Sequence, residues 1–386
     1  MSRFVFLCPL TLLVLTSACL ADAAYPTPWV AGVTKDSVYV SLEATDTIEA
    51  TVQFGTTTSY GMTATTENTQ ATDAPTYVHN IKLTGLLPNT EYHYRVTQGS
   101  SVSADYSFWT APLAGTSVRW GYAADSRAGS NSAHNTIAGL IASYAPKMMV
   151  YGGDIAHYAT RASYNAEWFQ PNQAALNATT PWVNAVGNHE TWGSVTKAFT
   201  QSPTGDPDYF SFDYGDAHIL VLNSMIPHGL GSAQWDFAAA DLAASTQTWK
   251  IVVSHYPPYA WRDYWGDKGD ADFRDMADAI FEPNGVDMVL SGDSHFYQHS
   301  LVDGIEYMVL GSFGAPLYVP TTGPGVVYSE STYSFGIFDM TSTSLTFNTY
   351  RMDNSQIESI VFAIPEPATV TLLGLGAIAM LRKRRN

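Results

Sequence analysis

The pattern of apolar and polar positions divides the chain into two regions. Between Pro26 and Pro112, apolar residues alternate with polar ones in short runs such as 37–42, and glycine, proline and asparagine separate the runs. A period of two is typical of strands that bury one face. This region therefore predicts an all-β sandwich over residues 26–112.

The second region, residues 117–352, alternates short apolar runs with longer helical patterns. Buried strands are expected at 148–151, 218–222, 251–253 and 288–290, and helices at 133–144, 233–246 and 270–281. This alternation predicts an α/β domain. Polar residues that follow its strands should collect at one edge of the sheet and form the functional site.

The two ends of the chain predict processing segments. Residues 1–23 have one basic residue, an apolar run and a small-residue end at Ala23, as in a secretory signal peptide. Residues 362–386 contain Pro365-Glu366-Pro367, a short apolar stretch and four basic residues, and resemble the PEP-CTERM sorting signal of Gram-negative bacteria. We expect export to the periplasm, cell surface or extracellular matrix, with transient contact to the membrane and a sorting protease.

Composition narrows the choice of partners and cofactors. Both cysteines, Cys8 and Cys19, lie in the predicted leader, so the processed chain should have neither disulfides nor thiolate ligands. The net charge of −17 repels nucleic-acid backbones, so no nucleic-acid partner is expected. An anionic substrate would need local positive charge, which bound metal ions can supply.

Five polar clusters follow strand-like runs in the second region. They are Asp125-Ser126-Arg127, Gly153-Asp154-Ile155-Ala156-His157, Gly187-Asn188-His189-Glu190, Val252-Val253-Ser254-His255 and Gly292-Asp293-Ser294-His295. Carboxylate and amide oxygens mixed with imidazoles suit first-row metal ions.

In order and spacing, these clusters resemble the calcineurin-like metallophosphoesterase superfamily, and within it the purple acid phosphatases. Residues 83–112 resemble a fibronectin type III-like module of the kind that precedes the catalytic domain in that family. The resemblance implies an α/β fold. Its core would be a metallophosphoesterase β-sandwich flanked by helices, preceded by an all-β fibronectin type III-like sandwich.

The resemblance also implies a site for two metal ions and a phosphate ester substrate, hydrolysed by a metal-bound hydroxide. Asp154 would bridge the ions. The remaining ligands would be Asp125, His157 and His295 for one ion, and Asn188, His255 and Asp293 for the other. His189 would act as a general acid or as a hydrogen-bond donor to the phosphoryl group. The further substrate-binding candidates are Arg127, His228 and Tyr256.

Three positions depart from the family pattern. His157 stands where the purple enzymes have tyrosine, so the purple colour should be absent and Fe, Mn or Zn are all reasonable ions. Asp293 replaces a histidine ligand, and Arg127 stands where non-purple relatives place a histidine.

The leading hypothesis is an exported phosphatase that hydrolyses phosphate monoesters. A phosphodiesterase or nucleotide-cleaving enzyme is the first alternative. A non-catalytic extracellular matrix protein with a degenerate site is the second.

Overall fold

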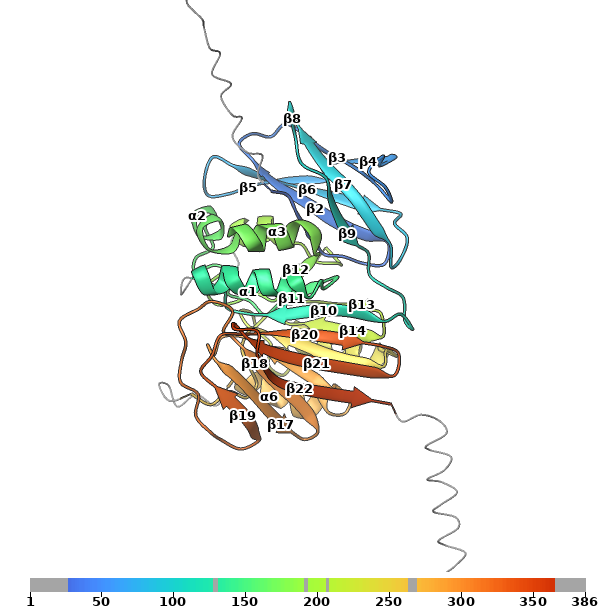
Figure 1. The fold of residues 1–386 in the computed structure, drawn as a ribbon. Coiled ribbons are helices and arrows are strands. Elements are labelled where there is room, and N and C mark those ends of the chain that lie inside the picture. The colour runs from blue at the N-terminus through green and yellow to red at the C-terminus, as the bar shows by residue number, and fades with distance from the viewer. Residues whose placement is uncertain (1–26, 128–130, 191–193, 206–207, 263–268, 365–386) are drawn as a thin grey trace, which may run out of the picture.

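The computed structural model of the chain describes residues 27–127, 131–190, 194–205, 208–262 and 269–364 (Figure 1). The predicted signal peptide and nearly all of the predicted sorting signal lie outside the described residues. Within those ranges, no helix has both the length and the apolar character needed to cross a bilayer.

A long mixed sheet runs through both regions of the chain. Its strands are buried on both faces near its centre, where the sequence predicts a buried strand at 148–151. In spatial order the strands are β22 (Gln356–Ala363), β21 (Ser344–Arg351), β20 (Ser334–Met340), β10 (Val118–Ala123), β11 (Met149–Tyr151), β12 (Trp182–Asn184), β1 (Trp29–Ala31), β2 (Ser37–Ala44), β6 (Tyr77–Thr84) and β5 (Asn68–Ala71).

A second sheet stacks on the C-terminal half of the first. Its central strands pair in parallel, with Val253 of β15 beside Leu290 of β16. In spatial order its strands are β13 (Phe210–Tyr214), β14 (Ala217–Val221), β15 (Trp249–Ser254), β16 (Met288–Ser291), β18 (Ile305–Leu310), β17 (Tyr297–Val302) and β19 (Val326–Glu330).

A third, smaller sheet completes the N-terminal β region. It packs against β2 and β6, and along its two central strands buried positions alternate with more exposed ones, as the sequence predicts. Its strands are β4 (Met62–Thr65), β3 (Ala50–Gly55), β7 (Glu91–Gln98) and β8 (Ser101–Val102), with β9 (Tyr106–Trp109) on β7.

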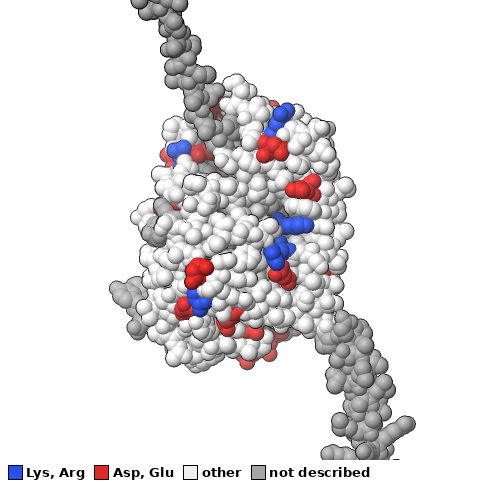
Figure 2. All heavy atoms as spheres, viewed as in Figure 1, with Lys and Arg blue, Asp and Glu red and all other residues white. Residues whose placement is uncertain are grey.

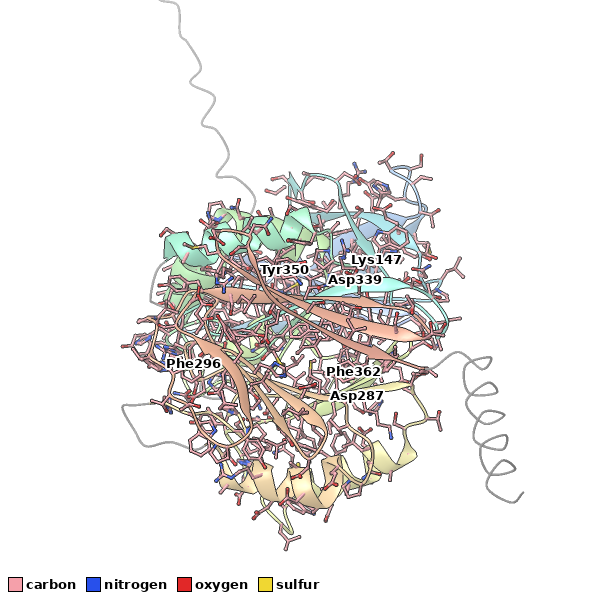
Figure 3. All side chains as sticks on the ribbon, turned by 60° about the horizontal axis from the view of Figure 1, so that its bottom comes forward. Lys147, Asp287, Phe296, Asp339, Tyr350 and Phe362 are labelled. Carbon is pink, nitrogen blue, oxygen red and sulfur yellow. The ribbon has the colours of Figure 1, made fainter. Side chains whose placement is uncertain are left out.

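Helices cover the outer faces of the two large sheets, and Figure 3 shows the lower helix layer beneath the second sheet. One side has α1 (Asn131–Ser143), α2 (Arg161–Ser163), η1 (Tyr164–Trp168), α3 (Pro171–Thr179) and α4 (Ser194–Phe199), and the other has α5 (Ala233–Ala244), α6 (Ala271–Met276) and η2 (Ala277–Phe281). The predicted β-sandwich flanked by helices is confirmed. The expected helix at 270–281 begins with Asp270, whose side chain caps the backbone N–H of Phe273 at 2.9 Å, and ends in a π-helical turn.

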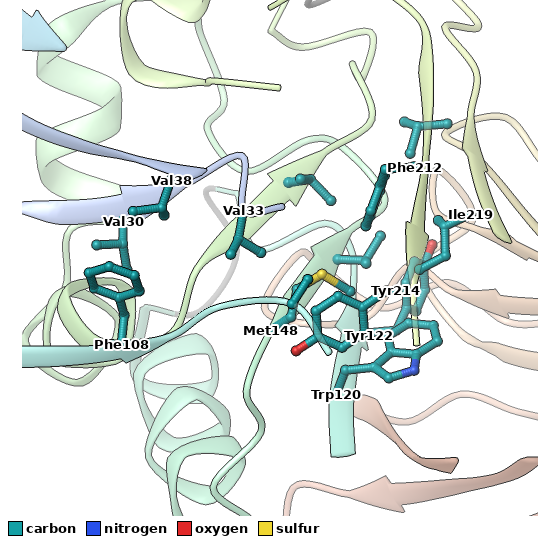
Figure 4. Close-up of a cluster of buried hydrophobic side chains, with 14 of the residues drawn as sticks. Val30, Val33, Val38, Phe108, Trp120, Tyr122, Met148, Phe212, Tyr214 and Ile219 are labelled. Atoms are coloured by element: carbon teal, nitrogen blue, oxygen red, sulfur yellow. The ribbon is translucent and has the colours of Figure 1, made fainter. Parts of the chain in front are cut away.

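The N-terminal region is joined to the rest of the molecule by strand pairing and by a shared core. Strand β1 pairs in parallel with β12, with Ala31 beside Trp182. Figure 4 shows Val30 and Phe108 in the same apolar cluster as Trp120 and Tyr122. The Tyr94 hydroxyl also donates to the carbonyl of Ala178 at 2.7 Å. The β region therefore braces the strands from which the site loops emerge.

Charged side chains are scattered over the face drawn in Figure 2, where Lys and Arg form no broad patch among the described residues.

Candidate metal centre

The five predicted clusters lie in loops that leave two stacked sheets at the same end. Asp125, Asp154 and Asn188 come after the neighbouring strands β10, β11 and β12. His255 and His295 come after β15 and β16, which are neighbours in the second sheet. We expected the edge of one sheet; the structure corrects this, because the ligand candidates meet where the ends of two sheets adjoin.

Three of the candidate aspartates adopt a left-handed backbone conformation. Their φ angles are 62° at Asp125, 52° at Asp154 and 60° at Asp293. Such conformations cost about 1–3 kcal/mol each outside glycine and occur most often at functional sites. At Asp125 and Asp154, carboxylate oxygens lie within 4.8 Å of each other and of a ring nitrogen of His255.

Glycines in the same loops make room for the carboxylates. A Cβ at Gly187 would collide with the side chain of Asp154, and a Cβ at Gly292 would collide with that of Asp125. Close packing therefore explains why glycine precedes Asn188 and Asp293, because only glycine lets the backbone approach these carboxylate oxygens.

On one side of Asp154, two side-chain oxygens lie close to one imidazole nitrogen. The Oδ1 atom of Asn188 lies 3.0 Å from Nε2 of His255, and Oδ1 of Asp154 lies 3.5 Å from the same nitrogen. The Nδ1 atom of His255 lies 2.7 Å from the carbonyl of Gly152 and must donate to it. In a neutral His255, Nε2 would therefore carry a lone pair directed at the oxygens of Asn188 and Asp154. This contact is favourable only if a cation lies between these atoms or Nε2 is protonated.

On the other side, Asp125 and His295 form a similar pair. Oδ1 of Asp125 lies 3.4 Å from Nε2 of His295, whose Nδ1 is fixed by the carbonyl of Pro316 at 2.8 Å. Asp125 is fully buried, and among the described residues its Oδ1 accepts no hydrogen bond. A buried carboxylate oxygen without a donor is costly unless a cation or proton completes it.

Ligand atoms of Asp125, Asp154 and His255 all lie within 4.8 Å of one another, and all three residues are buried. Burial alone would lower the pKa of His255, but the charges of Asp154, Asp125 and Asp293 outweigh it and raise the pKa to about 9. Burial also raises the pKa of Asp293. The residues therefore fit a metal ion in both donor type and charge.

His157 and His189 lie beside each other at the rim, with ring centroids 4.7 Å apart. The Nδ1 atom of His189 lies 3.1 Å from the carbonyl of His157 and must donate to it, so its Nε2 is the nitrogen left for a ligand. Burial, partly opposed by the charge of Asp154, lowers the pKa of His189.

Two glutamates hold these loops in place. Glu190 is fully buried and accepts from the backbone N–H groups of Ile155 at 2.6 Å and Gly187 at 3.0 Å, which ties two site loops together. Burial and the charge of Asp154 raise the pKa of Glu190 to about 7. Glu167 accepts from the backbone N–H of His157 at 2.6 Å.

A cavity of about 280 Å³ opens beside the centre. Tyr256 and Asp293, both predicted site residues, line it together with Arg262 and Asp270. His228 is not among the described lining residues; its Nε2 contacts Asp270 Oδ1 at 3.1 Å and its ring stacks on Phe273.

Two residues of the centre were missed by the sequence reasoning. Arg262 lies 3.3 Å from Asp293, and the only signal for it was its place directly after Trp261 in a chain with few basic residues. The ring of Tyr318 stacks on His295 with centroids 4.1 Å apart, and its position after β18 carries no recognisable pattern.

Comparison with known protein families gives three matches. The description "Purple acid Phosphatase, N-terminal domain" matches residues 27–110, "Calcineurin-like phosphoesterase" matches 126–297, and "PEP-CTERM protein-sorting motif" matches 363–385. The predicted recognition is therefore confirmed, while the finer likeness of the first domain to fibronectin type III stays a prediction.

Individual relatives agree with these matches. Purple acid phosphatase 1 of Ipomoea batatas is 25% identical over 73% of this chain and 70% of its own length. Phosphoenolpyruvate phosphatase of Allium cepa is 26% identical over 64% of this chain, which spans only 57% of that relative. The structure of a purple acid phosphatase from seeds of yellow lupin, Lupinus luteus, superposes with a TM-score of 0.77. That superposition covers 88% of this chain and 74% of the lupin chain at 18% identity, which establishes the common fold.

The loops at the strand ends, the buried carboxylates with facing imidazoles and the three family matches agree with one another. Residues 126–297 of this chain form a domain of the calcineurin-like phosphoesterase type, and residues 27–110 match the N-terminal domain of the purple acid phosphatases, so the chain resembles metal-dependent phosphoric ester hydrolases in both of its regions.

Proposed function

We propose that the protein is an exported, metal-dependent phosphatase that hydrolyses phosphate monoesters, with a catalytic domain over residues 117–352. The observation that carries the proposal is the buried cluster of Asp125, Asp154 and His255, whose ligand atoms all lie within 4.8 Å of one another. Oδ1 of Asp125 accepts no hydrogen bond among the described residues, so the hydrogen bonds of the cluster leave a buried ligand atom for a cation.

The proposed ligands divide by the two oxygens of Asp154. Asn188, His255 and Asp293 would belong to the ion beside its Oδ1, which lies 3.5 Å from Nε2 of His255. Asp125, His157 and His295 would belong to the ion beside its Oδ2, which accepts from Arg127, a residue that also contacts both of these histidines. Iron, manganese or zinc ions held there would supply Lewis acidity and lower the pKa of a bound water.

The remaining roles follow from where the side chains lie. His189 has its Nδ1 anchored and its Nε2 left for a substrate oxygen, so it would donate to the developing charge or protonate the leaving group. Tyr256 lines the cavity and would contact the ester group, while Arg127, only 11% exposed, would meet the phosphate.

Two observations favour monoesters and export. The onion relative is named a phosphoenolpyruvate phosphatase, and that substrate is a monoester. The sorting motif matched at 363–385 supports export in a Gram-negative bacterium. Cell fractionation tests the second point, because a protein found only in the cytoplasm would contradict export.

Turnover of p-nitrophenyl phosphate and of bis(p-nitrophenyl) phosphate by the metal-loaded protein tests the activity. We expect the monoester to be turned over with the higher kcat/KM. Preference for the diester would favour the phosphodiesterase alternative, and no turnover of either ester would favour the non-catalytic one.

A further inference from the structure

One basic side chain already lies among the proposed ligands on the Asp125 side. The Nε atom of Arg127 donates to Oδ2 of Asp154 at 2.8 Å. Its Nη2 lies 3.1 Å from Nε2 of His295, and its Nη1 lies 3.4 Å from Nδ1 of His157. A guanidinium can only donate, so each of these contacts uses an acceptor atom that a metal ion would also use.

The orientation of His295 makes this competition specific. Its Nδ1 must donate to the carbonyl of Pro316, so Nε2 carries the lone pair. That lone pair can accept from Arg127 or coordinate a cation, but it cannot do both. Arg127 is almost fully buried, which strengthens its charge-assisted contact with Asp154.

The Asn188 side differs in this respect. Among the described contacts there, the only guanidinium is that of Arg262, and it meets Asp293 at the outer edge at 3.3 Å. At the centre of this side, Oδ1 of Asn188 lies beside Nε2 of His255, and no guanidinium contacts either atom among the described contacts. A cation can therefore enter the centre of this side without displacing a guanidinium.

We propose that Arg127 is an intramolecular competitor of one of the two metal ions, so that the two sites fill unequally. The ion on the Asn188 side binds first, and an ion on the Asp125 side binds only after the guanidinium leaves Asp154, His157 and His295. This inference rests on the proposed metal-dependent function. It also gives Arg127 a second position, because the displaced guanidinium becomes available to a substrate phosphate.

The expected difference follows from population arithmetic. If the guanidinium occupies the site nearly all of the time, the apparent affinity of the second ion falls by the fraction of time that the site is open. Charge-assisted contacts of this kind make that penalty roughly 10- to 100-fold.

The test is titration of the metal-free full chain with Mn²⁺ and, separately, Zn²⁺ by calorimetry, with metal analysis after equilibrium dialysis. We expect one tight ion and a second that binds roughly 10- to 100-fold more weakly. Arg127→Met keeps the aliphatic part of the side chain but removes its hydrogen-bond donors. It should reduce the difference in affinity between the two ions to less than about threefold. Arg119→Met removes an arginine paired with Asp339 at 2.7 Å, far along the first sheet, and should leave the difference unchanged.

Thermal unfolding first establishes that each variant is folded. If Arg127→Met is not, Arg127→Lys serves instead, since a lysine keeps the charge but lacks the fork that reaches both imidazoles, and an intermediate difference is expected. Two equal ions in the wild type, or an unchanged difference in the Arg127 variants, would overturn the inference while leaving the proposed function intact. Binding of no ion by any variant would overturn the proposed function itself.

Discussion

Two groups of histidines and carboxylates in this molecule differ in their hydrogen bonding. Around His299, the Nε2 atom meets Oε2 of Glu306 at 2.6 Å and Nδ1 meets Oε2 of Glu358 at 3.3 Å. Glu358 also accepts from the hydroxyl of Tyr297 at 2.8 Å. In this group every donor has an acceptor, so it is complete without a ligand.

The candidate metal centre is incomplete by the same measure. A protonated His255 can donate from Nε2 to Oδ1 of Asn188 at 3.0 Å, but the buried Oδ1 of Asp125 lacks a donor among the described residues. The aspartates there are also strained, with φ near 60°, whereas none of the His299 group has a positive φ. The comparison separates two uses of the same side chains: the His299 group stabilises the fold, and the metal centre holds acceptors in place for a cation.

The largest effect should come from Asp154→Ala. Because Asp154 faces both groups of ligands, we expect loss of metal binding and at least about a 1000-fold fall in kcat/KM. Metal analysis and kinetics on the folded variant measure both. Glu306→Gln, a matched change in the His299 group, should retain both, and if it lost metal as well the distinction between the groups would fail.

A smaller catalytic effect is expected for His189→Ala. Loss of a donor or acid beside the substrate should lower kcat by roughly 100- to 10,000-fold, while metal content stays at the wild-type level because His189 is not a proposed ligand. Loss of metal in this variant would instead place His189 among the residues that hold the centre together.

The opposite pattern is expected for His299→Ala. This change leaves Glu306 and Glu358 facing each other with their imidazole partner removed, and it should lower the free energy of unfolding by about 2–4 kcal/mol. Urea denaturation measures the loss. Metal stoichiometry should be unchanged, and a change in it would show that the two groups are coupled.

The smallest effect concerns pH. Burial would lower the pKa of His299, but its hydrogen bonds to Glu306 and Glu358 and their charges outweigh burial and raise the pKa to about 9. A raised folded-state pKa stabilises the fold fully below the unfolded value of about 6.5, and this stabilisation is lost as pH rises through about 9.

Metal-free wild type and His299→Ala should therefore differ in unfolding free energy by less at pH 9 than at pH 6.5. The slope is at most about 1.4 kcal/mol per pH unit. Denaturation curves at several pH values measure it, and a difference independent of pH would mean that His299 is neutral in the fold.

The sequence correctly placed the ligand candidates after strands, because that placement follows from local patterns. A strand followed by Gly-Asp or Gly-Asn sets both the position of the carboxylate and the close approach that glycine allows, as at Gly187 and Gly292. The helices at 133–144 and 233–246 were likewise recovered, with α1 at Asn131–Ser143 and α5 at Ala233–Ala244.

What the sequence could not predict depends on contacts between distant segments. The pairing of β1 with β12, which continues one sheet across both regions, rests on a short parallel register between residues about 150 positions apart. The reach of Arg127 to His295, and the carbonyl of Gly152 that orients His255, are likewise set only by the folded arrangement. No local pattern encodes which atom of an imidazole points inward.

Anomalous X-ray diffraction from crystals of the metal-loaded protein tests the central claim most directly. We predict a strong peak within coordination distance of Oδ1 of Asp154, Oδ1 of Asn188 and Nε2 of His255, with a weaker peak on the Asp125 side. Crystals without an anomalous peak at these atoms, or with the ion bound at the His299 group instead, would contradict the account.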